Sequence, residues 1–117
     1  VLSPLAISVN NTYKPTDGNL NITLVANGQA ISTIAPSSGK WYAEFIFTGG
    51  TLSTDTRFGV ELVTDYTANY VGSSAGGYCY VSDGTKGNNN SFSAYGATWT
   101  TNDVIGICID KDNNKLR

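Results

Sequence analysis

The sequence predicts an all-β fold, a sandwich of two antiparallel sheets, and three observations favour it. No window of eleven or more residues has the apolar spacing of an amphipathic helix without Gly, Pro or β-branched clusters. Short runs rich in Val, Ile, Thr and Tyr alternate with turn signals such as Asp-Gly, Asn-Gly and Gly-Gly. Gly, Ser, Thr and Asn, which supply turns, are abundant. We therefore expect about eight to ten short strands.

The first third of the chain predicts three strands, at residues 5–9, 20–26 and 29–35. An Asp-Gly pair at 17–18 marks a turn before the second strand. The Asn-Gly pair at 27–28 is the strongest short hairpin signal and joins the second strand to the third. Pro36 ends the third strand, since proline cannot donate to a ladder.

The rest of the chain predicts strands or short extended pieces at 40–47, 57–64, 78–82, 91–96, 98–99, 104–110 and 115–117. Gly59 lies inside one strand, which indicates a bulge or a close backbone approach. Residues 85–90 (TKGNNN) are expected to be a polar loop. The strand at 104–110 is nearly apolar throughout, which is typical of a strand covered on both faces.

The segment KWYAEFIF at 40–47 holds the densest group of aromatic residues in the chain. Alternate side chains of a strand point to opposite faces, so Trp41, Ala43, Phe45 and Phe47 share one face. A face of this kind packs between two sheets. We therefore interpret it as sandwich core rather than a ligand platform.

Length and charge restrict the class of protein. The 117 residues predict one domain over 1–117. Only 14% of residues are charged and the net charge is −2, which does not fit nucleic-acid binding. No apolar stretch is long enough for membrane insertion, and there is no signal peptide. The chain lacks methionine and stops where a strand begins, so we expect an excerpt whose C-terminal strands are missing.

Several catalytic and metal-binding arrangements are excluded by the residue types present. The chain has no histidine, which excludes Ser–His–Asp and Cys–His catalysis and histidine-ligated metals. Cys79 and Cys108 form no CxxC pair and sit in apolar alternations, so two small buried thiols are favoured, although their pairing stays open. We expect no cofactor and no metal.

Two acidic patterns in the sequence lack features that the matching functional sites require. Glycosidases on related folds place acids on one strand, whereas Glu44 and Glu61 lie on different strands. We therefore expect no catalytic residues and no enzyme activity. The segment DKDNN at 110–114 has the alternation of a calcium loop but lacks its glycine and closing glutamate, so a hairpin turn is the better interpretation.

Four segments in order, SSGKWYAEF, RFGVEL, YVGSSAGGYCYVSDG and YGATWTTNDVIGICIDKDNNKL, resemble a SPRY domain over residues from about 18 to the end. Asn102 stands where the family usually has glycine, and asparagine tolerates the left-handed conformation that such a turn requires. Ala43 stands where the family often has a bulky aromatic residue. The resemblance implies a concanavalin-like, jelly-roll sandwich that binds partners rather than catalysing a reaction.

The polar, weakly charged texture of the chain resembles SPRY-like segments of bacteriophage tail, fibre and capsid-decoration proteins. This resemblance implies a structural protein located in the virion, a homo-oligomer that contacts other virion subunits and a host-surface glycan or protein. One alternative is a carbohydrate-binding adhesin module. A second alternative is a peptide-binding SPRY adaptor, which the low charge disfavours.

Aromatic residues cluster among Gly, Ser and Asn in the second half of the chain. Tyr and Trp provide large contact areas at little cost in ordering, and Ser, Gly and Asn provide adaptable hydrogen bonds. The candidate partner-binding residues are Tyr66, Tyr70, Tyr95 and Trp99. An ordinary sandwich edge with half-buried tyrosines explains the same pattern equally well. Tyr78 and Tyr80 flank Cys79, so at least one face of their strand is expected to be core.

Overall fold

A computed structural model describes residues 2–7, 15–23, 28–49, 52–62, 64–65 and 70–117. The chain divides into two compact units, Val1–Ala35 with Leu62–Tyr70, and Pro36–Glu61 with Val71–Arg117. Every regular element of the described residues is a β-strand, and no membrane-spanning helix occurs among them. The prediction of an all-β chain is confirmed, whereas the prediction of one domain over 1–117 stays a prediction.

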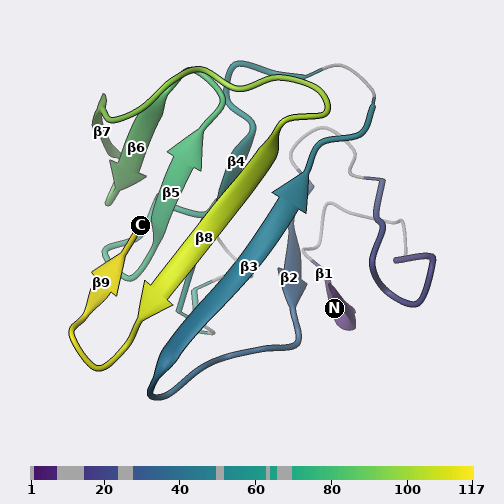
Figure 1. Cartoon of the computed structure of the whole chain (residues 1–117), viewed down its shortest axis with the longest axis horizontal. Helices are drawn as coiled ribbons and strands as arrows, with labels where there is room; N and C mark the ends of the chain where they lie inside the picture. The colour runs from purple at the N-terminus through teal and green to yellow at the C-terminus, as the bar shows by residue number, and fades with distance from the viewer. Residues whose placement is uncertain (1, 8–14, 24–27, 50–51, 63, 66–69) are drawn as a thin grey trace. The chain divides into compact units, whose positions relative to one another are not determined.

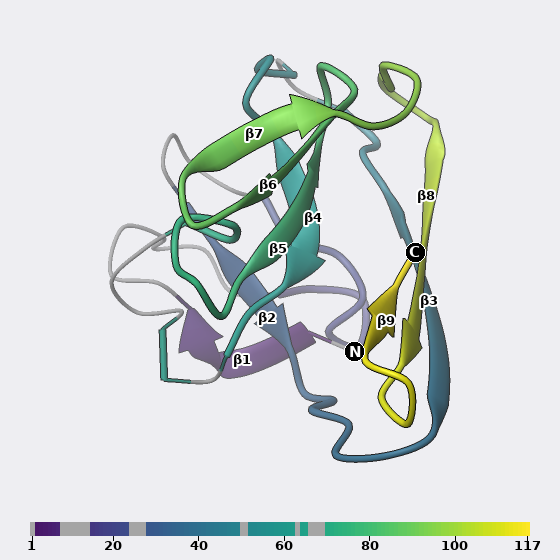
Figure 2. The same cartoon turned by 90° about the vertical axis from the view of Figure 1, so that its left-hand side faces the viewer.

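The second unit contains two antiparallel sheets (Figure 1). One sheet has the order β3-β8-β9, with β3 at Lys40–Ile46, β8 at Val104–Asp110 and β9 at Lys115–Leu116. The other has the order β4-β5-β6-β7, with β4 at Arg57–Val60, β5 at Tyr78–Val81, β6 at Thr85–Asn88 and β7 at Ser91–Ala94. Figure 2 views the first of these sheets edge-on beside the second. The predicted two-sheet sandwich is confirmed.

Aromatic rings join the two sheets of the second unit. The rings of Phe45 on β3 and Phe58 on β4 stack with their centroids 5.0 Å apart. Phe58 also contacts the Trp99 ring at 5.2 Å. The register places Phe45 opposite Ile105, and Ile105 and Ile107 are both buried. The inward face of β3 is therefore core at Phe45, as the alternation of aromatic residues predicts.

Burial falls off along this inward face. Trp41 is 46% exposed, and its indole N–H donates to the Ser38 carbonyl at 2.7 Å. Phe47 lies just beyond the end of β3 and is half-buried. The core prediction therefore holds best in the middle of the segment, where the second sheet lies opposite.

The outward face of β8 differs from the prediction of a strand covered on both faces. Val104 is 53% exposed and Cys108 is also exposed, so that prediction is wrong. The cause is the sheet's one-sided packing, which covers only the face with Ile105 and Ile107. Both cysteines are free thiols, and the expectation of burial is right for Cys79 and wrong for Cys108.

The polar stretch at 85–90 was expected to be a loop, and this prediction is wrong. The stretch contains strand β6 and the turn that follows it. Asn89 and Asn90 have φ values of 51° and 57° and join β6 to β7. Two central residues with positive φ form a type I′ turn, the geometry that suits a tight hairpin. Gly87 faces Cys79 across the ladder, where a Cβ atom would meet the Phe92 ring. The polar composition of this segment does not predict a strand, because the pairing of β6 with β7 depends on the turn between them.

Gly59 has the close backbone approach that its place in the strand predicts. A Cβ atom there would lie 2.8 Å from the Cys79 Cα atom. Strand β4 is shorter than the expected 57–64, because it ends at Val60. The next side chain, Glu61, accepts hydrogen bonds from the Ser74 hydroxyl and from the Gly72 N–H at 3.3 Å. Glu61 thus holds the loop at 71–77.

Asn88 secures the same loop from the end of β6. Its side-chain amide donates to the Gly77 carbonyl at 2.7 Å and to the Ala75 carbonyl at 3.1 Å. Cys79 is 4% exposed and Val81 is 2% exposed, and both lie on the sheet face opposite Phe58 and Tyr80. The tyrosine-rich strand therefore has one core face, as predicted.

The first unit contains β1 at Leu2–Ile7 and β2 at Ala30–Ser32, which pair antiparallel with an irregular register. The strand predicted at 20–26 is wrong for residues 20–23, which form a turn and an isolated bridge between Thr16 and Asn21. Positive φ at Asp17, Gly18 and Asn19 turns the chain back there. The rest of that strand, with Asn27 of the predicted hairpin, lies outside the described residues.

Candidate functional site

A groove of about 1100 Å³ lies between the two sheets of the second unit, and Phe58 is among the residues that line it. Its volume lies just above the usual range for ligand pockets, roughly 300–1,000 Å³. We call it the inter-sheet groove. Residues that line it include Phe58, Tyr78, Tyr80, Lys86, Asn88, Ser91, Ser93, Tyr95, Ile105, Ile107, Ile109 and Leu116.

One wall of the inter-sheet groove is apolar. Ile105, Ile107 and Ile109 alternate along β8 and share one face of the strand. Leu116 on β9 lies opposite Ile109 and therefore shares that face. Leu116 is 37% exposed, so the apolar wall is accessible at the β9 edge of the sheet.

The other wall is aromatic and polar. Phe58, Tyr78, Tyr80, Lys86 and Ser93 share one face of the second sheet, because Phe58 pairs with Tyr80, Tyr80 with Lys86, and Lys86 with Ser93. Tyr78 is 48% exposed. This wall offers ring surface together with hydroxyl and ammonium donors, which suits recognition of a polar ligand or chain.

Tyr80 and Tyr95 form the fixed part of this wall. Their rings meet edge to face with centroids 5.5 Å apart, and the Tyr80 hydroxyl donates to the Ala97 carbonyl. Burial raises the pKa of Tyr80 above its usual value. The Lys86 ammonium lies 5.2 Å from the centre of the Tyr95 ring, within cation–π range.

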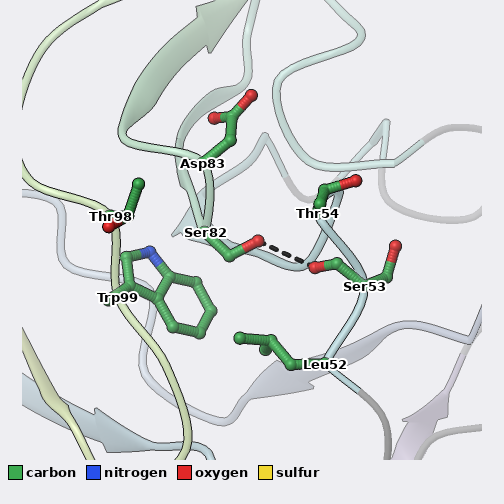
Figure 3. A pocket seen from close by; sticks show the side chains of 7 residues that line it. All are labelled: Leu52, Ser53, Thr54, Ser82, Asp83, Thr98 and Trp99. Atoms are coloured by element: carbon green, nitrogen blue, oxygen red, sulfur yellow. Dashed lines mark hydrogen bonds between the residues drawn. The ribbon is translucent and has the colours of Figure 1, made fainter.

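A second, smaller pocket of about 300 Å³ lies beside Trp99 (Figure 3). Its wall includes Leu52, and the Ser82 hydroxyl donates to the Ser53 carbonyl at 2.8 Å behind it. The Trp99 ring is 5% exposed, and its indole nitrogen has no hydrogen-bond partner among the described residues. Trp99 is therefore a core residue that also lines this pocket, rather than an exposed loop side chain.

The four predicted binding residues do not form one described cluster. Tyr95 is 54% exposed and lines the inter-sheet groove, and Trp99 lines both pockets. Tyr70 is 43% exposed and belongs to the first unit. Tyr66 lies outside the described residues. Their roles in binding stay predictions.

Sequence reasoning missed most of the polar wall. Lys86, Asn88 and Ser93 lie in segments expected to be a polar loop and a short extended piece. The run of three asparagines at 88–90 was the available signal, because asparagine tolerates the positive φ of a type I′ turn. With that turn identified, period-two alternation places these side chains on one face.

Glu44 and Glu61 have separate structural contacts. Glu44 lies on the outward face of β3 and accepts a hydrogen bond from the Tyr42 hydroxyl at 2.7 Å. This bond raises the pKa of Tyr42. Glu61 instead accepts from the loop at 71–77. Neither residue lines the inter-sheet groove.

The segment at 110–114 forms the turn of the β8–β9 hairpin, as predicted. The Asp110 carboxylate accepts from the Asn113 backbone N–H at 3.1 Å and from its side-chain amide at 2.9 Å. These bonds lower the pKa of Asp110. Asp112 accepts from the Gly39 N–H at 2.8 Å. In the part of the chain that the structure describes, no three Cys, Asp or Glu residues gather as metal ligands.

Comparison with known proteins covers the second unit almost completely. A family model described as SPRY domain matches residues 40–117. This range contains every strand of the two sheets that enclose the inter-sheet groove. No curated protein and no solved structure matches the chain.

Proposed function

Because the chain belongs to the SPRY domain family, whose members are generally non-catalytic protein-interaction domains, we propose that it binds a partner protein through the inter-sheet groove. The observation that carries this proposal is that one wall of the groove is apolar and the other is aromatic and polar. Half-buried Ile109 and exposed Leu116 offer apolar surface on one wall, and Tyr78 and Tyr95 offer accessible rings on the other. Such a surface accommodates a segment that is apolar on one side and polar on the other.

Binding without chemical change is consistent with the residues of the groove. Its acidic residues are Asp103 and Asp110, and both already accept hydrogen bonds. Its hydroxyl and amide groups are suited to orienting a ligand rather than to attacking it. The groove therefore supports recognition as its task.

Adjacent residues of β7 provide a sharp test of this site. Ser93 lines the groove and Ala94 is on the other face of the strand, and both are exposed. Peptide ligands selected from a random display library are measured against wild type, Ser93→Arg and Ala94→Arg by fluorescence anisotropy. We expect Ser93→Arg to weaken binding at least about tenfold, because a bulky charge enters the groove, and Ala94→Arg to leave it unchanged. Equal affinity of both variants contradicts groove binding.

We further propose that the partner is a neighbouring subunit of a bacteriophage virion and that the protein is a structural component of that particle. The support is the low content of charged residues, 14%, and the polar composition, which is rich in Asn, Thr and Ser. A fibre, tail or decoration component forms symmetric oligomers. Size-exclusion chromatography with light scattering is expected to give a stable homo-oligomer, and a monomer at every concentration contradicts this assignment.

A second candidate function is binding of a host-surface glycan. The favouring observation is the aromatic–polar wall, where Tyr78 and Tyr95 offer rings near the Ser93 hydroxyl. On a glycan array, specific binding that is lost in Tyr95→Ala and retained in Tyr42→Ala supports this function, since Tyr42 is exposed on the outward face of the other sheet. Without any glycan signal, this candidate is rejected.

A further inference from the structure

We propose that Lys86 and Tyr95 form a carboxylate-binding site on the aromatic and polar wall of the inter-sheet groove, and that the partner protein places an Asp or Glu side chain there. The inference rests on the proposed function and specifies the chemistry of the occupant. It follows from the position of Lys86 on the wall, from the aromatic ring beside its ammonium group, and from the lack of a counter-ion in the described part of the chain.

Lys86 brings a positive charge to a wall that is otherwise uncharged. Among the described residues of β4 to β7 that line the groove, it is the only Lys, Arg, Asp or Glu. It pairs with Tyr80 on one side and with Ser93 on the other, so the three side chains share the face that lines the groove. Ser93 is small and lies directly opposite, which leaves space beside the Lys86 side chain. Ser93→Arg fills this space, which agrees with the loss of binding expected above.

The Tyr95 ring holds the Lys86 ammonium in place. The ammonium lies 5.2 Å from the centre of this ring, within the range of a cation–π contact. The ring is itself fixed edge to face against Tyr80, with centroids 5.5 Å apart, and the Tyr80 hydroxyl donates to the Ala97 carbonyl. Lys86 therefore loses fewer side-chain conformations on binding a ligand than a lysine surrounded by water.

Lys86 has no counter-ion among the described residues. Asp103 and Asp110, the acidic residues of the groove, have other contacts. The Asp103 carboxylate accepts from the Thr100 N–H at 2.7 Å, and the Asp110 carboxylate lies 3.8 Å from the Lys40 ammonium. The Lys86 ammonium can therefore pair with a carboxylate that enters the groove.

The Tyr95 hydroxyl supplies a second donor. Tyr95 is 54% exposed, and its hydroxyl makes no hydrogen bond in the described part of the chain. An ionised carboxyl group has two oxygen atoms that only accept, so it can bond to the ammonium and to the hydroxyl at once. Hydrogen bonds to ionised groups are roughly twice as strong as those between neutral groups. This pair of donors therefore favours a carboxylate over an amide or a hydroxyl.

The wall across the groove determines the neighbours of the acidic residue. Ile107 is buried and Ile109 is half-buried on β8, and both line the groove. Apolar side chains of the partner complement these residues. A protein segment offers a carboxylate and apolar side chains together, whereas an acidic sugar offers mainly hydroxyl groups beside its carboxylate. The occupant is therefore a protein segment in which Asp or Glu has apolar neighbours.

The charge preference is tested with one random peptide library displayed and selected in parallel on wild type, Lys86→Glu and Lys40→Glu. We expect wild type to enrich Asp or Glu at one ligand position, and Lys86→Glu to enrich Lys or Arg there, because the charge of the site is reversed. Lys40→Glu makes the same charge change on β3, away from the groove lining, and is expected to keep the wild-type preference. Slow exchange of the Tyr95 amide, which donates to the Gly84 carbonyl at 3.1 Å, establishes that Lys86→Glu keeps the β6–β7 hairpin.

Direct contact is tested with a double-mutant cycle on one selected acidic peptide, measured by fluorescence anisotropy. The protein change is Lys86→Met, and the peptide change replaces the acidic residue with its amide. We expect each single change to weaken binding roughly fivefold, and both together to weaken it little more than one alone. Tyr95→Phe removes the hydroxyl and keeps the ring, and it is expected to weaken binding of the acidic peptide about two- to fivefold.

The outcomes separate this inference from the proposed function. The same ligand composition on wild type and Lys86→Glu, or additive losses in the cycle, overturns the inference. If the selected peptides lack an acidic residue but are sensitive to Ser93→Arg, the inference fails and the proposed function stands. If no selected peptide responds to Ser93→Arg, both fail. Binding of an acidic glycan that is lost in Lys86→Glu, without selection of any acidic peptide, also overturns the inference, because the occupant is then a carbohydrate.

Discussion

At the scale of single residues, Trp99 combines two properties that oppose each other. Its ring is almost fully buried against Phe58, and its indole N–H has no hydrogen-bond partner among the described residues. Burial of the ring stabilises the fold, whereas burial of an unpaired N–H costs about 1–3 kcal/mol. The contribution of Trp99 to stability is therefore smaller than its buried area suggests.

Substitutions at Trp99 separate the stabilisation that comes from ring burial from the cost of the unpaired indole N–H. Trp99→Ala leaves a large cavity and is expected to lower the free energy of unfolding by about 3–5 kcal/mol. Trp99→Phe keeps much of the ring and removes the unpaired N–H, so a loss of only about 1 kcal/mol is expected. Urea denaturation measures both. Equal losses for the two variants indicate that the indole N–H makes a hydrogen bond that stabilises the protein.

Asp83 links stability to pH through Thr85. Its carboxylate accepts from the Thr85 hydroxyl at 2.7 Å and from the Thr85 N–H at 2.9 Å, and the hydroxyl bond first, then the backbone bond, lowers the pKa of Asp83. A carboxyl whose pKa is lower in the folded state stabilises the fold above its unfolded pKa, about 3.9. That stabilisation is lost as the pH falls through the folded pKa.

Thr85→Ala tests this link because it removes the hydroxyl donor and leaves the backbone N–H. We expect the pKa of Asp83 to rise toward its usual value in the variant, and the dependence of unfolding free energy on pH below about 4 to become less steep. The carboxyl carbon shift of Asp83, followed by NMR during acid titration, reports the pKa. The same titration curve in both proteins contradicts the role of Thr85.

Some residue-scale features were predictable and others were not. The tight approach at Gly59 and the positive φ of Asn102, 71°, follow from local rules about which residues tolerate such backbone conformations. The exposure of Cys108 does not follow from such rules, because its neighbours in the sequence are apolar. Which face of β8 is covered depends on what packs against it.

At the scale of elements, strands with strong alternation were predicted closely and polar ones were missed. The bounds of β8 match the expected 104–110, and β3 is one residue shorter than the expected 40–47. β6 was expected to be a loop because its residues have low strand propensity. Pairing on both sides, with β5 and β7, stabilises it as a strand. Local propensity does not contain that information.

The loop at 71–77 depends on one carboxylate that local patterns did not single out. Glu61→Gln weakens the bonds from the Ser74 hydroxyl and the Gly72 N–H, and we expect a loss of about 1–3 kcal/mol in unfolding free energy. The Gly72 amide is expected to exchange faster with solvent. Glu44→Gln, a matched change at an exposed acceptor, is expected to cost less than about 0.5 kcal/mol. Similar losses for both variants contradict this role of Glu61.

At the scale of the whole molecule, the fold class was predictable and the binding groove was not. Alternation and turn signals are local, and together they indicate two antiparallel sheets. The groove brings together side chains that are distant in sequence, such as Tyr78 and Leu116. Their meeting depends on strand order and on the Phe45–Phe58 contact between the sheets. One sequence read by local rules does not determine that arrangement.

Chemical-shift mapping with a display-selected peptide tests most directly whether a partner binds between the two sheets. The isotopically labelled protein is titrated with the peptide, and backbone amide shifts are followed by NMR. We expect the largest changes at Ser93, Tyr95, Ile107 and Leu116, which line the groove. Changes confined to Tyr42, Ile46 and Val104, on the outward face of β3 and β8, would contradict binding in the groove.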